Sequence, residues 1–174
     1  MGPLKAEPSV RAAMECVTRS PRATFVLGVS LGQALAPGDV VALMGELGTG
    51  KTQLARGICR GAGIADEEVS SPTFAIVATY RGRLPIHHGD LYRLADLDEL
   101  YATGFFDLLG GDGACLVEWA DRIPGALPAE RLEITLAHVE GSPSARELTF
   151  LGLGERHAAL VAGLKRGRRG CGPR

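Results

Sequence analysis

A glycine-rich loop between an apolar run and a helical segment constrains this chain more than any other feature. Residues 45–52 read GELGTGKT and fit the pattern GxxxxGK[ST]. The preceding residues 39–44 (DVVALM) predict a buried strand, and residues 51–60 predict a helix. A strand, such a loop and a helix in this order form a unit that binds phosphate groups. We therefore expect an α/β fold built around a phosphate-binding loop.

The residue types in this loop each have a physical reason. Gly45, Gly48 and Gly50 allow backbone N–H groups to turn toward an anion, and the start of the helix adds a positive end. Lys51 can reach the β- and γ-phosphates of a nucleotide, and the Thr52 hydroxyl can bind Mg²⁺. A glycine-rich turn that only caps a helix has no need of the lysine. We therefore interpret the segment as a nucleotide-binding P-loop.

Two acidic residues at predicted strand ends are candidates for the magnesium side of such a site. Glu118 ends the apolar run ACLVE, and Asp90 follows the weaker strand pattern PIHHG. A carboxylate at a strand end can hold Mg²⁺ or its water ligands, or orient an attacking water molecule. We expect catalytic roles for Lys51, Asp90 and Glu118, and magnesium contacts from Thr52 and Glu118.

Three nearby features are less specific. Residues 70–73 (SSPT) carry hydroxyls that can face a γ-phosphate, although the same pattern is typical of a simple turn. His87 and His88 precede Asp90, and strand alternation predicts that they point to opposite faces. No further clustered ligands accompany them, which disfavours a zinc site. Trp119, the only tryptophan, fits a role in the core or at the site.

Length and charge limit the organisation of the chain. At roughly 150 residues per domain, 174 residues predict one domain. The net charge is −1, but residues 165–174 carry five basic side chains and no acid, which leaves −6 on the rest. This argues against a generally basic nucleic-acid-binding surface, and we expect no DNA partner. No apolar run matches the roughly 18 residues of a membrane span, and the four cysteines form no CxxC pair. We expect a cytoplasmic protein with reduced thiols and no membrane contact.

The pattern along the chain predicts a three-layer fold with a mixed parallel and antiparallel central sheet. We expect residues 1–22 to form an N-terminal arm with a short helix at 10–18, residues 23–164 a single domain, and residues 165–174 a disordered basic tail. Helices are expected at 23–36, 51–60, 96–102, 105–109 and 155–164. Strands are expected at 39–44, 73–79, 84–88, 114–117, 131–139 and 146–150, with antiparallel hairpins at 73–88 and 131–150.

Four blocks of the sequence together resemble the TsaE (YjeE) family. They are GDVVALMGELGTGKT at 38–52, SPTFAIV at 71–77, HGDLYRL at 88–94 and VEW at 117–119, in the family's order. The likeness covers roughly residues 23–150. The P-loop alone is shared by a large superfamily, whereas the combination is restrictive. The family consists of small ATPases of the bacterial machinery that makes threonylcarbamoyladenosine in tRNA.

The resemblance implies ATP and Mg²⁺ as cofactors and the TsaB and TsaD proteins as partners, with tRNA reached indirectly through their complex. In that family the ATPase supports turnover of the modification and does not itself transfer the carbamoyl group. The resemblance also makes Asp90 functionally important and residues 71–74 a switch-like segment. The expected nucleotide contacts are Thr24, Gly45, Glu46, Leu47, Gly48, Thr49, Gly50, Lys51, Thr52, Thr73, Trp119 and Arg146.

Two other function classes stay open at this stage. One is a small-molecule kinase of the P-loop superfamily, although only Arg122 and Arg131 are basic between Arg93 and Arg146, which is few for an arginine-rich lid. The other is a nucleotide-gated binding module in which hydrolysis is incidental. The basic tail either contacts tRNA through its charge or is a solvated end.

Overall fold

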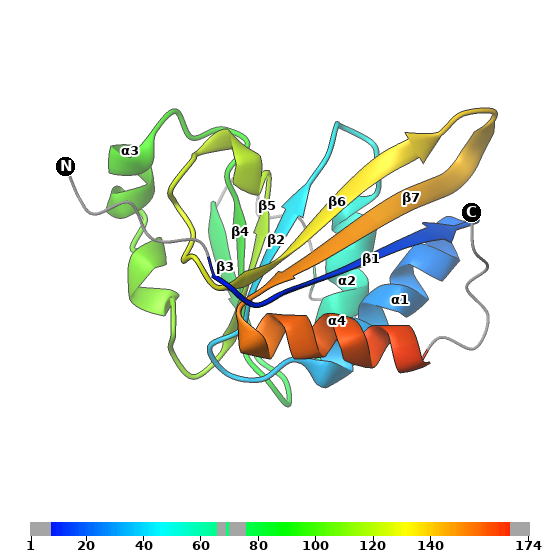
Figure 1. Cartoon of the computed structure of the whole chain (residues 1–174). Coiled ribbons are helices and arrows are strands. Elements are labelled where there is room, and N and C mark those ends of the chain that lie inside the picture. Colours follow the sequence, from blue (N-terminus) through cyan, green and yellow to red (C-terminus); the bar gives the residue numbers. More distant parts are fainter. Residues whose placement is uncertain (1–7, 66–68, 70–75, 168–174) are drawn as a thin grey trace.

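The centre of the protein is a seven-stranded mixed sheet with the order β1-β7-β6-β2-β5-β4-β3 (Figure 1). The structure is a computed structural model and describes residues 8–65, 69 and 76–167. Strands β6, β2, β5 and β4 run parallel, whereas β1, β7 and β3 pair antiparallel with their neighbours. The strands are β1 (Arg11–Thr18), β2 (Val40–Met44), β3 (Val77–Tyr80), β4 (Ile86–Asp90), β5 (Ala114–Glu118), β6 (Arg131–Val139) and β7 (Ser142–Leu153).

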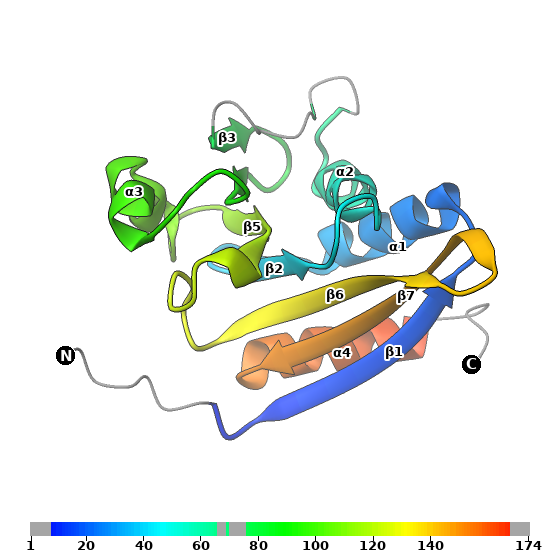
Figure 2. The same ribbon diagram turned by 90° about the horizontal axis from the view of Figure 1, so that it is seen from above.

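Helices lie on both faces of this sheet, which gives three layers. Helices α1 (Pro21–Ala34), α2 (Lys51–Gly61) and α4 (Glu155–Gly167) pack on one face (Figures 1 and 2). The other face is covered over part of its width by short helices, which pack over β2 and β5. These are α3 (Leu97–Ala102), η2 (Phe105–Leu108) and η3 (Ala120–Arg122).

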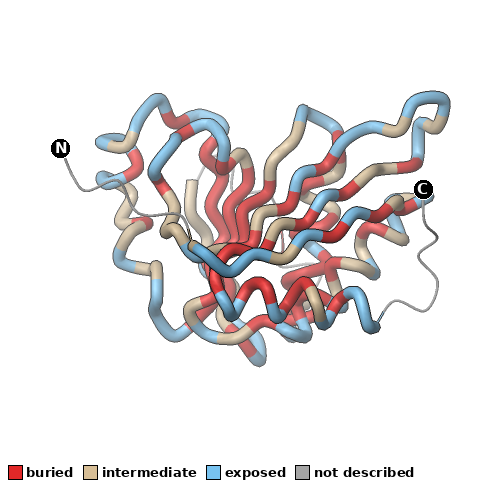
Figure 3. The backbone as a smooth tube through the Cα atoms, in the orientation of Figure 1, coloured by how far each residue is buried: buried red, intermediate tan, exposed pale blue. Residues whose placement is uncertain are grey.

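Strand β2 is buried on both faces and joins the two halves of the core (Figure 3). Val41 and Leu43 point into the cluster beneath the large helices, whereas Ala42 and Met44 meet the cluster under the short helices. Such two-sided burial is typical of a central parallel strand. The P-loop therefore begins at the end of a strand that is packed on both faces.

Helices α1 and α2 pack backbone against backbone through glycines. A Cβ added to Gly28 would collide with the carbonyl oxygen of Leu54, and one added to Gly32 would collide with that of Ile58. These oxygens belong to the backbone of α2 and cannot rotate away, so side chains here would force the helices apart. These glycines hold α2, and with it the P-loop, at a fixed distance from α1.

Most predicted elements are confirmed, including the mixed sheet and the antiparallel pairing of β3 with β4. The short helix expected at 10–18 is wrong, because these residues form β1, which pairs with β7 at the edge of the sheet. The predicted arm thus contains a strand of the sheet, and helix α1 begins at Pro21 with Ser20 as its N-cap.

The C-terminal part differs from the prediction at two points. Strand β7 begins at Ser142, so the late hairpin turns at 140–141 and its second strand is longer than expected. The disordered tail expected from 165 is wrong for residues 165–167, which continue α4; residues 168–174 lie outside the described residues. Within the described ranges, no helix has the length and apolar character needed to cross a membrane.

Candidate functional site

The P-loop follows β2 directly and depends on three glycines with positive φ. These angles are 131° at Gly45, 76° at Gly48 and 96° at Gly50, a region that side chains rarely adopt. A Cβ on Gly45 would also collide with the carbonyl oxygen of Leu136 on β6. Gly50 is the N-cap of α2, and no side chain caps this end of the helix. The positive end of an 11-residue helix therefore faces the loop.

Lys51 lies with its ammonium group folded onto the loop. Its Nζ donates to the carbonyl oxygens of Gly45 at 2.6 Å and Glu46 at 2.8 Å, and lies 3.7 Å from the centroid of the Trp119 ring. The side chain is largely shielded from solvent, and burial lowers the pKa of Lys51. Three carboxylates act in the opposite direction, those of Glu118, Asp121 and Asp90. The ammonium thus sits where it can exchange carbonyl partners for an anion.

Glu118 connects the P-loop helix to strand β4. Its Oε2 accepts a hydrogen bond from Thr52 Oγ1 at 3.0 Å, and its Oε1 lies 2.9 Å from His88 Nε2. Glu118 and His88 are almost completely buried. The parallel pairing of β4 with β5 sets Asp90 opposite Glu118, so both acids end neighbouring strands. Both carboxylates that the sequence suggests for the magnesium side therefore lie at the same edge of the sheet.

Asp90 and Trp119 line the same cavity as the P-loop, Asp90 at the end of β4 and Trp119 directly after β5. Asp90 Oδ1 accepts a hydrogen bond from the backbone N–H of Tyr92 at 2.9 Å. Trp119 has a left-handed backbone with φ of 58°, and its ring lies 4.9 Å from that of Tyr92. A left-handed tryptophan costs free energy and persists where the surroundings impose it, which is frequent at functional sites. The strained backbone here turns the indole over Lys51.

A cavity of about 440 Å³ joins these groups. It is lined by Leu47, Gly48, Gly50, Lys51, Thr52, Asp90, Tyr92, Glu118 and Trp119. All of these residues except Tyr92 are candidates for the site from the sequence alone. The signal for Tyr92 was present, because it follows Asp90 by two residues within the HGDLYRL block. Gly45, Glu46 and Thr49 form the base of the loop, where Thr49 Oγ1 donates to the Glu46 carbonyl at 2.8 Å.

The remaining predicted contacts stand apart from this cavity. Arg146 on β7 donates to the carbonyl oxygens of Thr49 at 3.1 Å and Gly48 at 3.2 Å, so it holds the outside of the loop. Thr24 is buried in the first turn of α1, and its hydroxyl lies 2.7 Å from that of Thr18. Thr73 and the rest of the SPTF block (71–74) lie outside the described residues.

The donor set of the cavity fits Mg²⁺ bound together with phosphate. Thr52, Glu118 and Asp90 offer oxygen atoms, which are the ligands that this cation prefers. In the described part of the chain, no group of three or more His, Cys, Asp or Glu side chains could hold a metal by itself. Mg²⁺ commonly takes only one or two protein ligands and completes its shell with water and substrate phosphates.

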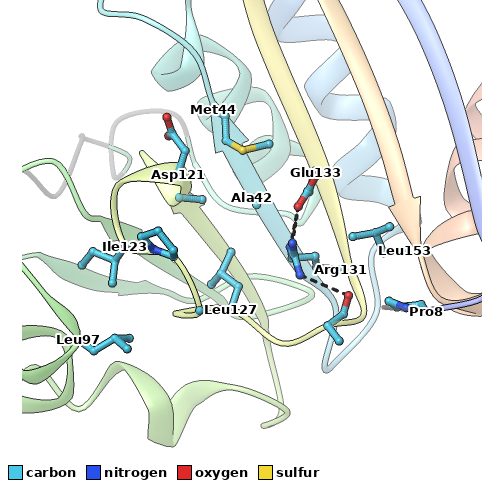
Figure 4. A pocket seen from close by; sticks show the side chains of 14 residues that line it. Pro8, Ala42, Met44, Leu97, Asp121, Ile123, Leu127, Arg131, Glu133 and Leu153 are labelled. Carbon is cyan, nitrogen blue, oxygen red and sulfur yellow. Dashed lines mark hydrogen bonds and ion pairs between the residues drawn. The ribbon is translucent and has the colours of Figure 1, made fainter. Parts of the chain in front are cut away.

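A larger cavity, of about 730 Å³, is a different one (Figure 4). It lies between β2, β6 and the segment that follows β5, and Met44, Asp121 and Glu133 are among its lining residues. Arg131 in its wall is already paired, since its Nε donates to Glu133 at 2.9 Å and its Nη1 to the Pro128 carbonyl at 2.7 Å. We place the candidate site in the smaller cavity because the P-loop and both strand-end acids meet there.

The strand–loop–helix unit on a mixed sheet defines this chain as an α/β protein of the P-loop type. Residues 18–148 match the family described as "Threonylcarbamoyl adenosine biosynthesis protein TsaE". The chain belongs to the TsaE family, as the resemblance of its four sequence blocks predicted.

Individual relatives agree with this assignment. The tRNA threonylcarbamoyladenosine biosynthesis protein TsaE of Treponema pallidum is 42% identical over 123 residues, which are 71% of this chain and 90% of that protein. The protein of the same name from Bacillus subtilis is 39% identical over 150 residues, covering 86% and 92%. The crystal structure of Bacillus subtilis YdiB is similar with a TM-score of 0.75 and 33% identity, over 91% of this chain and 97% of that chain.

Proposed function

We propose that this chain binds and hydrolyses ATP with Mg²⁺ and serves as an accessory subunit in making threonylcarbamoyladenosine in tRNA. One observation carries the proposal: Lys51, Thr52 and Glu118 meet Asp90 in one cavity at the carboxyl edge of the parallel strands. Ligands of open α/β sheets bind at this edge. Membership of the TsaE family supports the tRNA-modification role.

Each residue has a role that follows from its place in the cavity. The ammonium group of Lys51 exchanges the Gly45 and Glu46 carbonyls for phosphate oxygens, and it balances charge that builds up on the transferred phosphoryl group. Thr52 and Glu118 are the side chains that would hold Mg²⁺. When bound, Mg²⁺ neutralises negative charge on the phosphates.

Asp90 is the candidate for orienting the attacking water or accepting its proton. It ends the strand next to Glu118, its side chain is buried at the cavity wall, and the Tyr92 N–H fixes one of its oxygens. A carboxylate fixed in this way can accept a hydrogen bond from water in a constant direction. Trp119, which covers Lys51, is a proposed wall of the nucleotide site.

Phosphate release from ATP tests the hydrolytic part. We expect Asp90→Asn to lower the rate about a hundredfold or more, because the amide keeps the bond from Tyr92 but is a poor base. Lys51→Ala should also abolish turnover. Asp112→Asn is the matched control, since that side chain is 90% exposed. Wild-type turnover in Asp90→Asn would contradict the role of this residue.

Partner binding tests the second part. We propose TsaB and TsaD as partners in the cytoplasm, with tRNA contacted through their complex. The tagged chain should retain purified TsaB and TsaD in a pull-down, and the amounts retained should depend on ATP. With Lys51→Ala the amounts retained should be the same with and without ATP. If neither protein is retained, with or without ATP, the proposed partnership is contradicted. That result would not affect the ATPase proposal, which the phosphate-release assay tests.

A further inference from the structure

His88 is the most deeply buried histidine near the site, and the sequence predicts no role for it. It lies in β4 with none of its surface exposed. Its Nε2 is 2.9 Å from Glu118 Oε1, while the other oxygen of the same carboxylate accepts from Thr52 at 3.0 Å. Each oxygen of Glu118 therefore has one fixed partner, and the two partners come from different elements.

The bond to Glu118 defines which nitrogen of the imidazole carries the proton. A carboxylate oxygen only accepts, so Nε2 must donate. Among the described residues, Nδ1 of His88 is buried and has no hydrogen-bond partner. A buried polar nitrogen without a partner costs free energy, and an apolar side chain of similar size would avoid this cost. Packing alone therefore does not explain a histidine at this position.

The adjacent histidine shows what a structural role looks like in the same strand. His87 points to the opposite face of the sheet, where its Nδ1 lies 3.0 Å from Thr79 Oγ1 and its Nε2 lies 3.9 Å from Asp112 Oδ1. It is buried to a similar degree but is not among the described residues that line the candidate cavity. His87 is thus a matched control for substitutions at His88.

We propose that His88 is a positioning residue that holds the Glu118 carboxylate so that its second oxygen faces Thr52 and the cation. This inference rests on the proposed nucleotide site, which it deepens. Without the Nε2–H donor, the carboxylate keeps only its bond to Thr52 and can rotate about its terminal torsion. Partners that orient a metal-binding carboxylate typically change metal affinity by about ten- to a hundredfold.

Calorimetric titration separates this role from a merely structural one. ATP is titrated into wild type, His88→Asn, His88→Gln and His87→Asn, first with EDTA and then with increasing Mg²⁺. In His88→Asn we expect the half-saturating Mg²⁺ concentration to rise about ten- to a hundredfold, with Mg²⁺-free ATP affinity unchanged. In His88→Gln, whose amide N–H can reach Glu118, the half-saturating Mg²⁺ concentration should return most of the way to the wild-type value. In His87→Asn it should not change.

Two results would overturn the inference: an unchanged Mg²⁺ requirement in His88→Asn, or an equal loss of ATP affinity with and without Mg²⁺.

Imidazole nitrogen NMR of the wild type gives a second readout. It needs no nucleotide and does not depend on whether a variant folds. We expect a protonated Nε2 and an unprotonated Nδ1 at His88. A protonated Nδ1 with a bare Nε2 would refute the His88–Glu118 bond. Absence of ATP binding in the wild type would instead refute the proposed function.

Discussion

Replacing Gly57 of α2 by alanine reverses the usual effect of such a change. In most helices alanine in place of glycine is favourable by about 0.5–1 kcal/mol, because it lowers the entropy of the unfolded chain. At Gly57 the new Cβ would collide with the Phe25 carbonyl oxygen and lie 3.0 Å from the Cα of Gly28. Both contacts are backbone atoms of α1, so neither can rotate out of the way.

The size of the effect follows from these two opposing contributions. Forcing an extra methyl group into a tight backbone contact costs about 1–3 kcal/mol. Because the collision is with backbone that cannot move aside, we take the upper half of this range, about 2–3 kcal/mol. After subtraction of the helical gain of about 0.5–1 kcal/mol, we expect Gly57→Ala to lower the free energy of unfolding by about 1–2.5 kcal/mol. For a domain of this size the midpoint of thermal unfolding should fall by roughly 2–10 °C.

Urea unfolding followed by circular dichroism measures this change, and Gly163→Ala supplies the matched control. Gly163 lies within α4, and a Cβ there would meet nothing within 4 Å, so this variant should be more stable than the wild type by about 0.5–1 kcal/mol. A Gly57→Ala protein at least as stable as Gly163→Ala would refute the close packing of α1 on α2.

Three further predictions concern the network around the P-loop strand and the site itself. Burial lowers the pKa of His157 below its usual 6.5. The neutral imidazole accepts a hydrogen bond through Nε2 from the Val40 N–H at 3.3 Å. The stabilising contribution of His157 is therefore present above pH 6.5 and is lost as the pH falls below 6.5. Urea midpoints between about pH 7.5 and pH 5 should therefore fall more for wild type than for His157→Gln. Trp119, the only tryptophan, lies against Lys51, so ATP should change its fluorescence in wild type but not in Lys51→Ala; an identical response in both would contradict the contact. Arg146→Ala removes the bonds to both P-loop carbonyls and should weaken ATP binding about tenfold by calorimetry, while unchanged affinity would show that the bonds to the loop do not matter.

Local patterns were sufficient for the central part of the fold. The apolar run before Gly45, the glycines of the loop and the helix after it depend on residues that are close in sequence, so strand β2 and helix α2 were predicted nearly to their ends. The strand-end positions of Asp90 and Glu118 also followed, because Glu118 ends the apolar run ACLVE and Asp90 follows the pattern PIHHG.

Features that depend on distant residues were not predictable in this way. Residues 11–18 contain good helix formers, and only pairing with β7 makes them a strand. His88 and Glu118 are 30 residues apart in the sequence, and their contact depends on the register of β4 against β5. Arg146 was expected at the nucleotide, but which side of the loop it approaches depends on how far β7 extends.

Equilibrium binding of ATP in the presence of Mg²⁺ tests the central claim most directly. The measurement is a calorimetric titration of wild type, Lys51→Ala and Lys165→Ala, the last being an exposed lysine of α4 that serves as control. We predict one ATP per chain for wild type and Lys165→Ala, and an affinity about ten- to a hundredfold lower for Lys51→Ala, because a charged hydrogen bond to phosphate is lost. Wild-type affinity in Lys51→Ala, or no binding by the wild-type chain, would contradict the assignment of this cavity as the nucleotide site.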